Sequence, residues 1–296
     1  MDFQTTLKVK QQIIDEALDK YLPKEPSPQN NIFEAMRYSV FAGGKRLRPI
    51  LMLAACEFAG GETERVLPFA CAIEMIHTYS LIHDDLPAMD NDDYRRGKLT
   101  NHKVFGEGIA ILAGDGLLNY AYELMLQSIL QHPSQSQNAT AAMYEIARAS
   151  GVYGMIGGQV VDLDSEKKQI DSITLDFIHN YKTGALFIAA IRSGAILAGT
   201  EPETLKHLTS YAENIGLGFQ ITDDILDIIG DEKKLGKKVG SDQENQKATY
   251  PAFHGLNHSF ERVNDLFQKG LAAIEHYGEK AQFFMDMAHY LVKREY

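Results

Sequence analysis

The stretch ERVLPFACAIEMIHTYSLIHDDLPAMD, residues 64–90, decides the fold of this chain. Up to residue 86 it is largely apolar, which predicts one long buried helix over about residues 64–86. The stretch then delivers three carboxylates, Asp84, Asp85 and Asp90. Because carboxylates are rarely buried unless they are paired or bind a metal ion, we expect a core helix with a binding site at its end.

Pro87 explains how these carboxylates can converge. Asp84 and Asp90 are six residues apart, which is poor register for one helix face. Pro87 disfavours helical geometry at Leu86 and ends or kinks the helix, so the chain can fold back and bring Asp90 near Asp84. Asp92 and Asp93 follow, and we expect them to be solvated loop charges. A competing interpretation is a His83-Asp84 metal pair, but no other obvious histidine pair would complete it.

A second acidic cluster follows a later apolar run. Asp223 and Asp227 are four residues apart and therefore share one helix face, with Asp224 beside them and Gln220 one turn earlier. Like charges at this spacing destabilise a bare helix, so the arrangement favours a bound cation. The alternative is a solvated acidic helix end, which fits poorly with the apolar neighbours: Phe219, Ile221, Ile225, Leu226, Ile228 and Ile229.

Two clusters of hard oxygen donors favour Mg²⁺, which keeps several waters and recruits substrate phosphates to complete its shell. Basic residues lie beside both clusters. Gly43–Pro49 places three cations within four positions before an expected helix start, where free N–H groups favour anions. The other basic positions are Arg95, Arg96, Lys182, Lys237, Lys238 and Lys247. Each alone is more often a solvated charge, but together they predict a polyphosphate site.

The rest of the chain reads as helical, and no sustained period-two pattern indicates strands. We expect an all-α fold in one domain over residues 1–296. Besides 64–86, we expect helices over these ranges: 13–22, 33–41, 49–60, 106–131, 138–162, 172–199, 202–229 and 259–294. Residues 90–103 read as a loop.

Bulk composition excludes several classes of function. Among 296 residues the formal net charge is −11, which argues against nucleic acid and anionic membranes as partners. No run of 18 or more apolar residues predicts a membrane-spanning helix, and the start of the chain lacks a signal-peptide pattern. Cys56 and Cys71 lie in apolar helical context and read as buried thiols in a reducing cytoplasm.

The ordered motifs resemble a known family. They are Gly-Gly-Lys-Arg-Leu-Arg-Pro at 43–49, Asp-Asp-Leu-Pro-Ala-Met-Asp at 84–90, Arg-Arg-Gly at 95–97, Gly-Gly-Gln at 157–159, Lys-Thr-Gly at 182–184 and Gln-x-x-Asp-Asp-Ile-Leu-Asp at 220–227. In this order they resemble the trans-isoprenyl diphosphate synthases, and within them the farnesyl diphosphate synthases of bacteria. The resemblance covers essentially the whole chain.

The resemblance implies an isoprenoid synthase-type bundle of about ten or more helices around a deep central cavity, working as a cytoplasmic homodimer. It implies Mg²⁺, three ions in each active site, with Mn²⁺ as a substitute, held by Asp84, Asp85, Asp90, Asp223, Asp224 and Asp227. It assigns contacts with the allylic diphosphate to Arg95, Lys182, Lys237 and Lys247. It assigns isopentenyl diphosphate to Lys45, Arg48, His77 and Arg96. Thr183 and Gln220 would lie near the developing carbocation, with Gln159 and Asp162 supporting them.

Product length depends on the helix before Asp84. The product tail should grow along it, and the family places a bulky stop at the fifth position before the cluster, here Tyr79. Helical geometry instead puts Ser80 most directly beneath Asp84, and an ordinary core tyrosine is the simpler alternative. His77 lies nearly on the face of Asp84 and could contact a second substrate or be a core histidine.

Other functions remain open at this point. A geranylgeranyl diphosphate synthase would share every motif except the bulky stop. A class I terpene cyclase would not need the second diphosphate site of Lys45, Arg48 and Arg96. A non-catalytic regulatory subunit would be expected to lack acidic ligands, and none is missing here.

Overall fold

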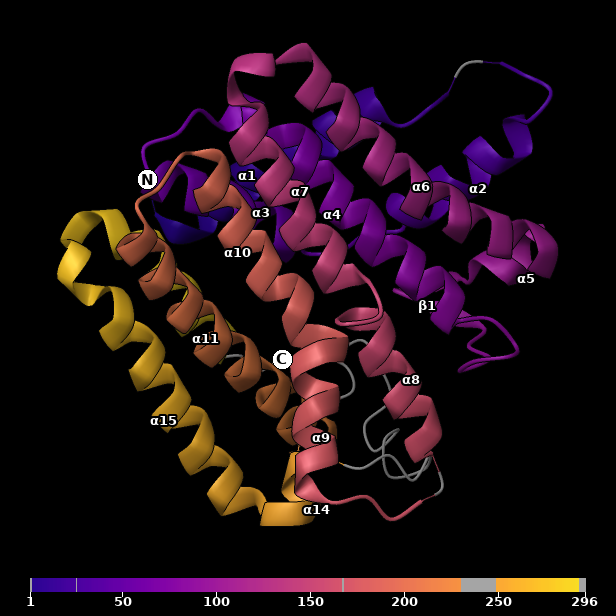
Figure 1. Cartoon of the computed structure of the whole chain (residues 1–296). Coiled ribbons are helices and arrows are strands. Elements are labelled where there is room, and N and C mark those ends of the chain that lie inside the picture. Colours follow the sequence, from indigo (N-terminus) through magenta and orange to yellow (C-terminus); the bar gives the residue numbers. More distant parts are fainter. Residues whose placement is uncertain (1, 25, 167, 230–248, 293–296) are drawn as a thin grey trace. The chain divides into compact units, whose positions relative to one another are not determined.

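The computed structural model describes residues 2–24, 26–166, 168–229 and 249–292 (Figure 1). They are almost entirely helical, which confirms the all-α prediction. Two predicted contacts, Lys237 and Lys247, lie outside the described residues. The chain divides into two compact units: Met1–Tyr144 with Ser193–Gly199, and Glu145–Arg192 with Thr200–Tyr296.

The first unit carries the elements from the amino terminus onward. They are α1 (Phe3–Tyr21), α2 (Asn30–Val40), α3 (Leu47–Phe58), α4 (Thr63–Asp84), β1 (Tyr94–Arg95), β2 (Lys98–Leu99), α5 (Asn101–Phe105), α6 (Glu107–Gln131), a 3₁₀ turn (Pro133–Gln135) and most of α7 (Ser136–Ser150). The end of α10 (Ala185–Leu197) also belongs to it.

Helix α4 is the core of the first unit, as the opening stretch predicts. It packs most extensively against α6, and also against α3 (Figure 1). Its residues from Phe69 to Ile76 are all buried. Each large apolar side chain of this kind contributes about 1.5–3 kcal/mol on burial. Burial of this apolar run therefore sets the position of Asp84 at the end of α4.

The segment expected to be a loop, residues 90–103, contains short regular structure. β1 and β2 pair antiparallel, with Tyr94 opposite Leu99. Arg96 (φ 55) and Gly97 (φ 75) form the intervening two-residue turn, whose positive φ values match a tight hairpin. The strands are only two residues long, which is too short for a period-two pattern to show in the sequence.

The second unit contains the remaining elements. They are α8 (Met155–Ser165), α9 (Ser172–Ile178), a π-helix (His179–Gly184), the start of α10, α11 (Pro202–Ile229), α14 (Tyr250–His254), α15 (Leu256–Ile274), a 3₁₀ segment (Glu275–Ala281) and α16 (Gln282–Val292). Helices α11 and α15 lie side by side (Figure 1). Apolar side chains from α9, α11, α14 and α15 form one core: Leu175, Ile221, Ile225, Tyr250, Val263 and Leu266.

Three predicted helices are interrupted. The expected helix 138–162 breaks between α7 and α8 because Gly154 adopts non-helical dihedrals (φ −140, ψ −125). The expected helix 172–199 changes to π geometry over His179–Gly184. The expected helix 259–294 starts earlier, at Leu256, and breaks where Gly278 takes φ 59 and ψ −129. Periodicity alone misses such breaks because the apolar spacing continues across them.

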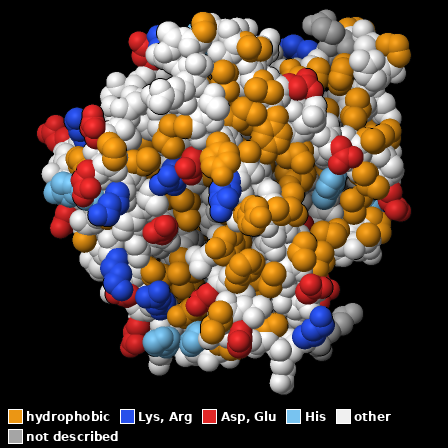
Figure 2. All heavy atoms as spheres, viewed as in Figure 1, with side chains coloured by type: hydrophobic (Ala, Val, Ile, Leu, Met, Phe, Trp, Pro, Cys, Tyr) orange, Lys and Arg blue, Asp and Glu red, His pale blue; other side chains and the backbone are white. Residues whose placement is uncertain are grey.

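The two cysteines agree with the sequence prediction. Both cysteines are buried and unpaired, and burial raises the pKa of the Cys56 thiol to about 11. By length and composition α4 could cross a membrane, but 72% of its most apolar window is buried in the protein. On the face shown in Figure 2, charged side chains of both signs are interspersed among exposed apolar ones.

Candidate active site

The first acidic motif begins where α4 ends. α4 terminates at Asp84, and the backbone N–H of Asp90 donates a 2.8 Å hydrogen bond to the carbonyl oxygen of Asp84. The chain therefore folds back after Pro87, as predicted. Asp84 and Asp90 are half-buried, whereas Asp92 and Asp93 are exposed. The motif thus offers two accessible carboxylates.

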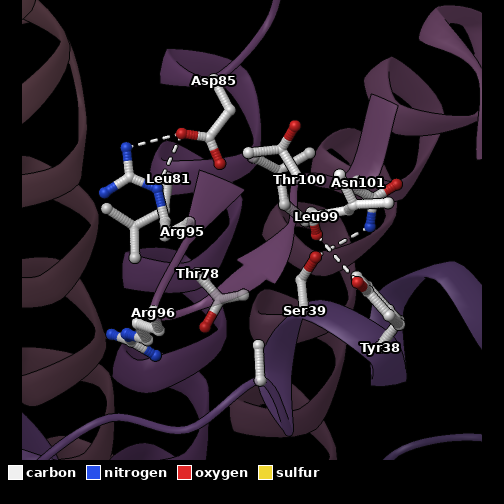
Figure 3. A pocket seen from close by; sticks show the side chains of 12 residues that line it. Tyr38, Ser39, Thr78, Leu81, Asp85, Arg95, Arg96, Leu99, Thr100 and Asn101 are labelled. Carbon is white, nitrogen blue, oxygen red and sulfur yellow. Dashed lines mark hydrogen bonds and ion pairs between the residues drawn. The ribbon is translucent and has the colours of Figure 1, made fainter. Parts of the chain in front are cut away.

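The middle carboxylate of this motif is already engaged. Asp85 is only 3% exposed, and its Oδ1 accepts from Arg95 Nε at 2.7 Å and Nη2 at 2.5 Å. Figure 3 shows the Arg95 guanidinium directed at Asp85. Burial alone would lower the pKa of Arg95, but the ion pair outweighs it and raises the pKa above its usual value. In this structure Arg95 binds the motif itself, and Asp85 anchors the hairpin.

A small pocket, with a volume of about 20 Å³, adjoins this pair. It is lined by the Asp85–Arg95 pair and Arg96 on one side, and by residues of α2, β2 and α5 on the other (Figure 3). Tyr38 donates to the carbonyl oxygen of Leu99 at 2.8 Å, and Asn101 donates to Ser39 at 2.8 Å. These bonds secure the hairpin that carries both arginines.

Four predicted isopentenyl diphosphate contacts also belong to the first unit. Lys45 and Arg96 are exposed, and Arg48 and His77 are half-buried. Burial, followed by the charges of Arg48, Arg96, Arg95 and Arg46, lowers the pKa of His77 well below 6.5. Burial and the charge of Arg96 likewise lower the pKa of Arg48.

This cluster has the features of an anion site. The buried Nε of Arg48 has no hydrogen-bond partner within the described part of the chain. Helix α3 begins at Leu47, so Arg48 also lies beside free N–H groups of a helix start. A diphosphate would offset the repulsion between these cations and satisfy the free donor.

The predicted chain-length position lies deep on α4. Tyr79 is 5% exposed, and burial raises its pKa to about 12. Its ring packs edge-on against His83, with centroids 5.7 Å apart. His83 Nε2 in turn lies 3.0 Å from the carbonyl oxygen of Ile111 on α6. Ser80 is half-buried and donates to the carbonyl oxygen of His77 at 2.9 Å, so Tyr79 is the bulkier and more fixed of the two.

In the second unit the π-helix positions Lys182 and Thr183. Lys182 donates to Asp162 on α8 at 2.5 Å, so the structure brings these predicted residues together. A side chain at Gly158 could not be accommodated, because its Cβ would lie 2.2 Å from the backbone nitrogen of Lys182. Close approach therefore requires glycine at this point of the Gly-Gly-Gln motif. π-Helical turns frequently mark functional sites.

The second acidic motif lies on regular helix near the end of α11. Asp223 is half-buried, whereas Asp224 is 6% and Asp227 1% exposed, which excludes a solvated helix end. Asp224 accepts from the backbone N–H of Tyr250 at 2.8 Å and lies 3.3 Å from His179. Gln220 Nε2 donates to Asp224 at 3.4 Å, a weak contact. As in the first motif, the middle carboxylate is held by protein groups.

The acidic residues fit Mg²⁺ better than a closed structural metal site. No group of three or more His, Cys, Asp or Glu side chains is preassembled around one point among the described residues. Asp84, Asp90 and Asp223 are nevertheless only half-buried. Mg²⁺ commonly takes one or two carboxylates and completes its shell with water and phosphate oxygens.

Several residues that organise the site were not predicted. Glu74, on α4, is 2% exposed and pairs with Arg46 at 2.9 Å. A single carboxylate within an apolar helix was the available sequence signal. His179 and Tyr250 contact Asp224. The sequence gave no comparable signal for them, because a histidine or a tyrosine in such a context usually has an ordinary structural role.

Two acidic motifs and a cation cluster on a helical scaffold are features of enzymes that bind diphosphate esters together with metal ions. The sequence model for polyprenyl synthetase matches residues 29–284, so the chain belongs to the polyprenyl synthetase family. It is a trans-prenyltransferase.

Individual relatives agree on the reaction and differ in product. The chain is 47% identical over 257 residues to the farnesyl diphosphate synthase of Geobacillus stearothermophilus, covering 87% of this chain and 86% of that one. It is also 47% identical over 291 residues to the geranylgeranyl diphosphate synthase of Cyanophora paradoxa, covering 98% and 96%. An FPP/GFPP synthase structure from Zymomonas mobilis superposes with a TM-score of 0.87 at 35% identity, covering 98% of both chains. Identity therefore establishes the reaction class and leaves product length open.

Proposed function

We propose that this protein is a farnesyl diphosphate synthase. It condenses isopentenyl diphosphate with dimethylallyl diphosphate and then with geranyl diphosphate to give (2E,6E)-farnesyl diphosphate. The observation that carries product length is Tyr79: it is buried on α4, five residues before Asp84, and its ring packs against His83. A bulky fixed ring there would block a longer chain. The alternative product, geranylgeranyl diphosphate, is favoured by the several relatives that are geranylgeranyl diphosphate synthases.

We assign Asp84, Asp90 and Asp223 to Mg²⁺ because they are half-buried, whereas the other aspartates of the two motifs are buried. Asp85, Asp224 and Asp227 support them from buried positions. When bound, Mg²⁺ supplies positive charge to the leaving diphosphate of the allylic substrate, and Mn²⁺ could replace it. Three ions in each active site complete this proposal.

The protein's own residues bind and orient both substrates in the proposed reaction. Lys182, held by Asp162, neutralises charge on the allylic diphosphate as its C–O bond breaks. Arg95 exchanges part of its contact with Asp85 for that diphosphate, and Lys237 and Lys247 add further charge. Thr183 and Gln220 present oxygen atoms toward the allylic cation.

The second substrate is bound without a metal ion in this proposal. Lys45, Arg48, His77 and Arg96 hold the diphosphate of isopentenyl diphosphate, whose alkene attacks the allylic cation. The new C–C bond leaves a tertiary cation, and a proton then passes to the released diphosphate. Water must be excluded throughout, since it would trap either cation.

We further propose that both compact units act together as a single polyprenyl synthetase domain over residues 1–296, because the family match at 29–284 spans both. We propose a homodimer that works in the cytoplasm on small soluble diphosphates. Size-exclusion chromatography with light scattering would contradict this assembly if it gave the 33.1 kDa monomer alone.

One assay tests the activity and its alternatives. The purified protein is incubated with isopentenyl and dimethylallyl diphosphates and Mg²⁺, and the dephosphorylated products are separated by chromatography. A fifteen-carbon product supports the proposal, and a twenty-carbon product establishes geranylgeranyl diphosphate synthase instead. A cyclic hydrocarbon formed from a supplied allylic diphosphate without isopentenyl diphosphate would indicate a terpene cyclase. The absence of any product would indicate a regulatory subunit.

A further inference from the structure

One arginine in the cation-rich segment Gly43–Arg48 faces the protein interior. Arg46 is 3% exposed, whereas the adjacent Lys45 is exposed. Its backbone is left-handed (φ 52, ψ 33), a conformation that is unfavourable for a residue with a Cβ. Such strain persists only where surrounding contacts determine it, and it gathers at functional sites.

The guanidinium of Arg46 is bound through all three nitrogens. Nη1 donates to Glu74 Oε1 at 2.9 Å, Nε donates to Asp15 Oδ1 at 2.8 Å, and Nη2 donates to the carbonyl oxygen of Val40 at 2.7 Å. These partners lie on α4, α1 and α2, so one side chain joins three helices. A buried ion pair stabilises a fold poorly compared with packed apolar residues, which points to a role in geometry.

The pair with Glu74 links the two elements that carry the cation cluster. Glu74 is three residues before His77, on the same side of α4. Arg46 lies between Lys45 and Arg48 in the chain. The ion pair therefore fixes the distance from His77 to these two cations.

Other contacts hold the same segment. Gln11 on α1 donates to the carbonyl oxygen of Gly44 at 3.0 Å, and Arg96 donates to the carbonyl oxygen of Gly43. A Cβ on Gly44, which has φ 130, would lie 2.6 Å from Nη1 of Arg96. Figure 3 shows Arg96 turned away from the Asp85–Arg95 pair. Arg96 thus packs directly on the backbone that Arg46 orders.

We propose that Arg46, with Glu74 and Asp15, is a positioning residue that sets the geometry of the site for the metal-free diphosphate of isopentenyl diphosphate. This inference rests on the proposed function and deepens it. Arg46 acts through Lys45, Arg48, His77 and Arg96, since its own guanidinium is fully used inside the protein. Loss of its contacts should weaken isopentenyl diphosphate binding and leave the allylic substrate unaffected.

The test compares Arg46→Lys and Glu74→Gln with the wild type. Arg46→Lys keeps the positive charge but lacks the planar guanidinium that donates to Asp15, Glu74 and Val40 together. Glu74→Gln keeps the shape of the side chain but loses its negative charge. Isothermal titration calorimetry with isopentenyl diphosphate alone gives its Kd, and steady-state assays give KM for isopentenyl and geranyl diphosphates. We expect Kd and KM for isopentenyl diphosphate to rise by roughly ten- to a hundredfold, and KM for geranyl diphosphate to change by less than about twofold.

Arg37→Lys is the matched control. Arg37 lies in the same unit, is also partly buried, and pairs with Asp19 away from the cation cluster. We expect this variant to lose a similar amount of thermal stability and to bind both substrates as the wild type does. Should Arg46→Lys fail to fold, Glu74→Gln and Asp15→Asn decide the question by the same measurements.

The outcomes distinguish a failure of the proposed function from a failure of the positioning role of Arg46. If the wild type neither binds isopentenyl diphosphate nor forms product, the proposed function fails, and the inference with it. If the wild type is active but both variants keep the wild-type Kd, or if both substrates weaken equally, only the positioning role is overturned.

Discussion

The two acidic motifs each contain three aspartates, but the spacing and the backbone setting of these aspartates differ. The first lies where α4 ends, and the chain folds back so that the backbone N–H of Asp90 donates to the carbonyl oxygen of Asp84. The second lies on uninterrupted helix near the end of α11. In both, the middle carboxylate is buried and bound by protein donors: Arg95 holds Asp85, and the Tyr250 N–H holds Asp224.

The comparison shows that adjacent aspartates within one motif can have separate roles. Asp85 ties α4 to the hairpin that carries Arg95 and Arg96, and Asp224 ties α11 to the start of α14. Asp84, Asp90 and Asp223 are half-buried, and these are the aspartates that we assign to a metal ion. A sequence motif therefore contains both the ligands and the groups that fix the neighbouring segments.

The largest effect is expected at the accessible positions. Asp84→Ala should lower kcat by roughly 10²–10³-fold or more, because it removes charge that binds the metal at the leaving diphosphate. Circular dichroism and the melting temperature should stay as in the wild type. Full activity with an unchanged spectrum would remove Asp84 from the metal site.

The second motif allows a sharper comparison between neighbours. Asp223→Ala should lose activity as Asp84→Ala does, with a smaller loss of stability than Asp224→Ala. Asp224→Ala should also lose orders of magnitude in turnover, and in addition about 1–3 kcal/mol of folding free energy, because the Tyr250 N–H is left unsatisfied. Urea denaturation measures this difference, and equal stability of the two variants would contradict the division of roles.

In the first motif the buried Tyr79 lies five residues before Asp84, whereas Gly218 occupies the corresponding position before Asp223. Tyr79→Ala should lengthen the product beyond fifteen carbons while leaving turnover of the first condensation within about tenfold. Chromatography of the products decides, with Ser80→Ala as the control that should keep the farnesyl product. An unchanged product from Tyr79→Ala would show that the limit lies elsewhere.

The smallest effect concerns protonation near the first motif. The pKa of His77 lies well below 6.5 because of burial and the nearby arginine charges. In the free enzyme, NMR at pH 6.5 should therefore find His77 neutral, where an ordinary histidine would be half protonated. Since the unfolded chain would bind that proton, stability should fall as the pH drops below about 6.5. Half protonation of His77 at pH 6.5 would contradict the claim that burial and the arginine charges lower its pKa.

Much of the fold was predictable because apolar periodicity is local. The long helix up to Asp84, its end shortly before Pro87, and the helix start near Pro49 all follow from nearby residues. The π-helix at Lys182 was not predictable, because it depends on how closely Gly158 lets α8 approach. The same holds for the hairpin, whose strands are too short to leave a pattern.

The site was predictable in residue type more than in role. The motifs named the aspartates, lysines and arginines, but only packing separates exposed Lys45 from buried Arg46, or half-buried Asp223 from Asp224. The ion pairs Asp85–Arg95 and Arg46–Glu74 join residues 10 and 28 positions apart. Such pairs depend on tertiary contacts that one sequence does not encode locally.

A crystal structure with Mg²⁺ and dimethylallyl thiolodiphosphate, a slowly reacting substrate analogue, tests the division of roles most directly. Our account predicts carboxylate oxygens of Asp84, Asp90 and Asp223 within about 2.1 Å of Mg²⁺ ions. It also predicts that Asp85 keeps a contact with Arg95 and that Asp224 stays on the Tyr250 N–H. Direct coordination of Mg²⁺ by Asp85 or Asp224, with these contacts broken, would contradict it.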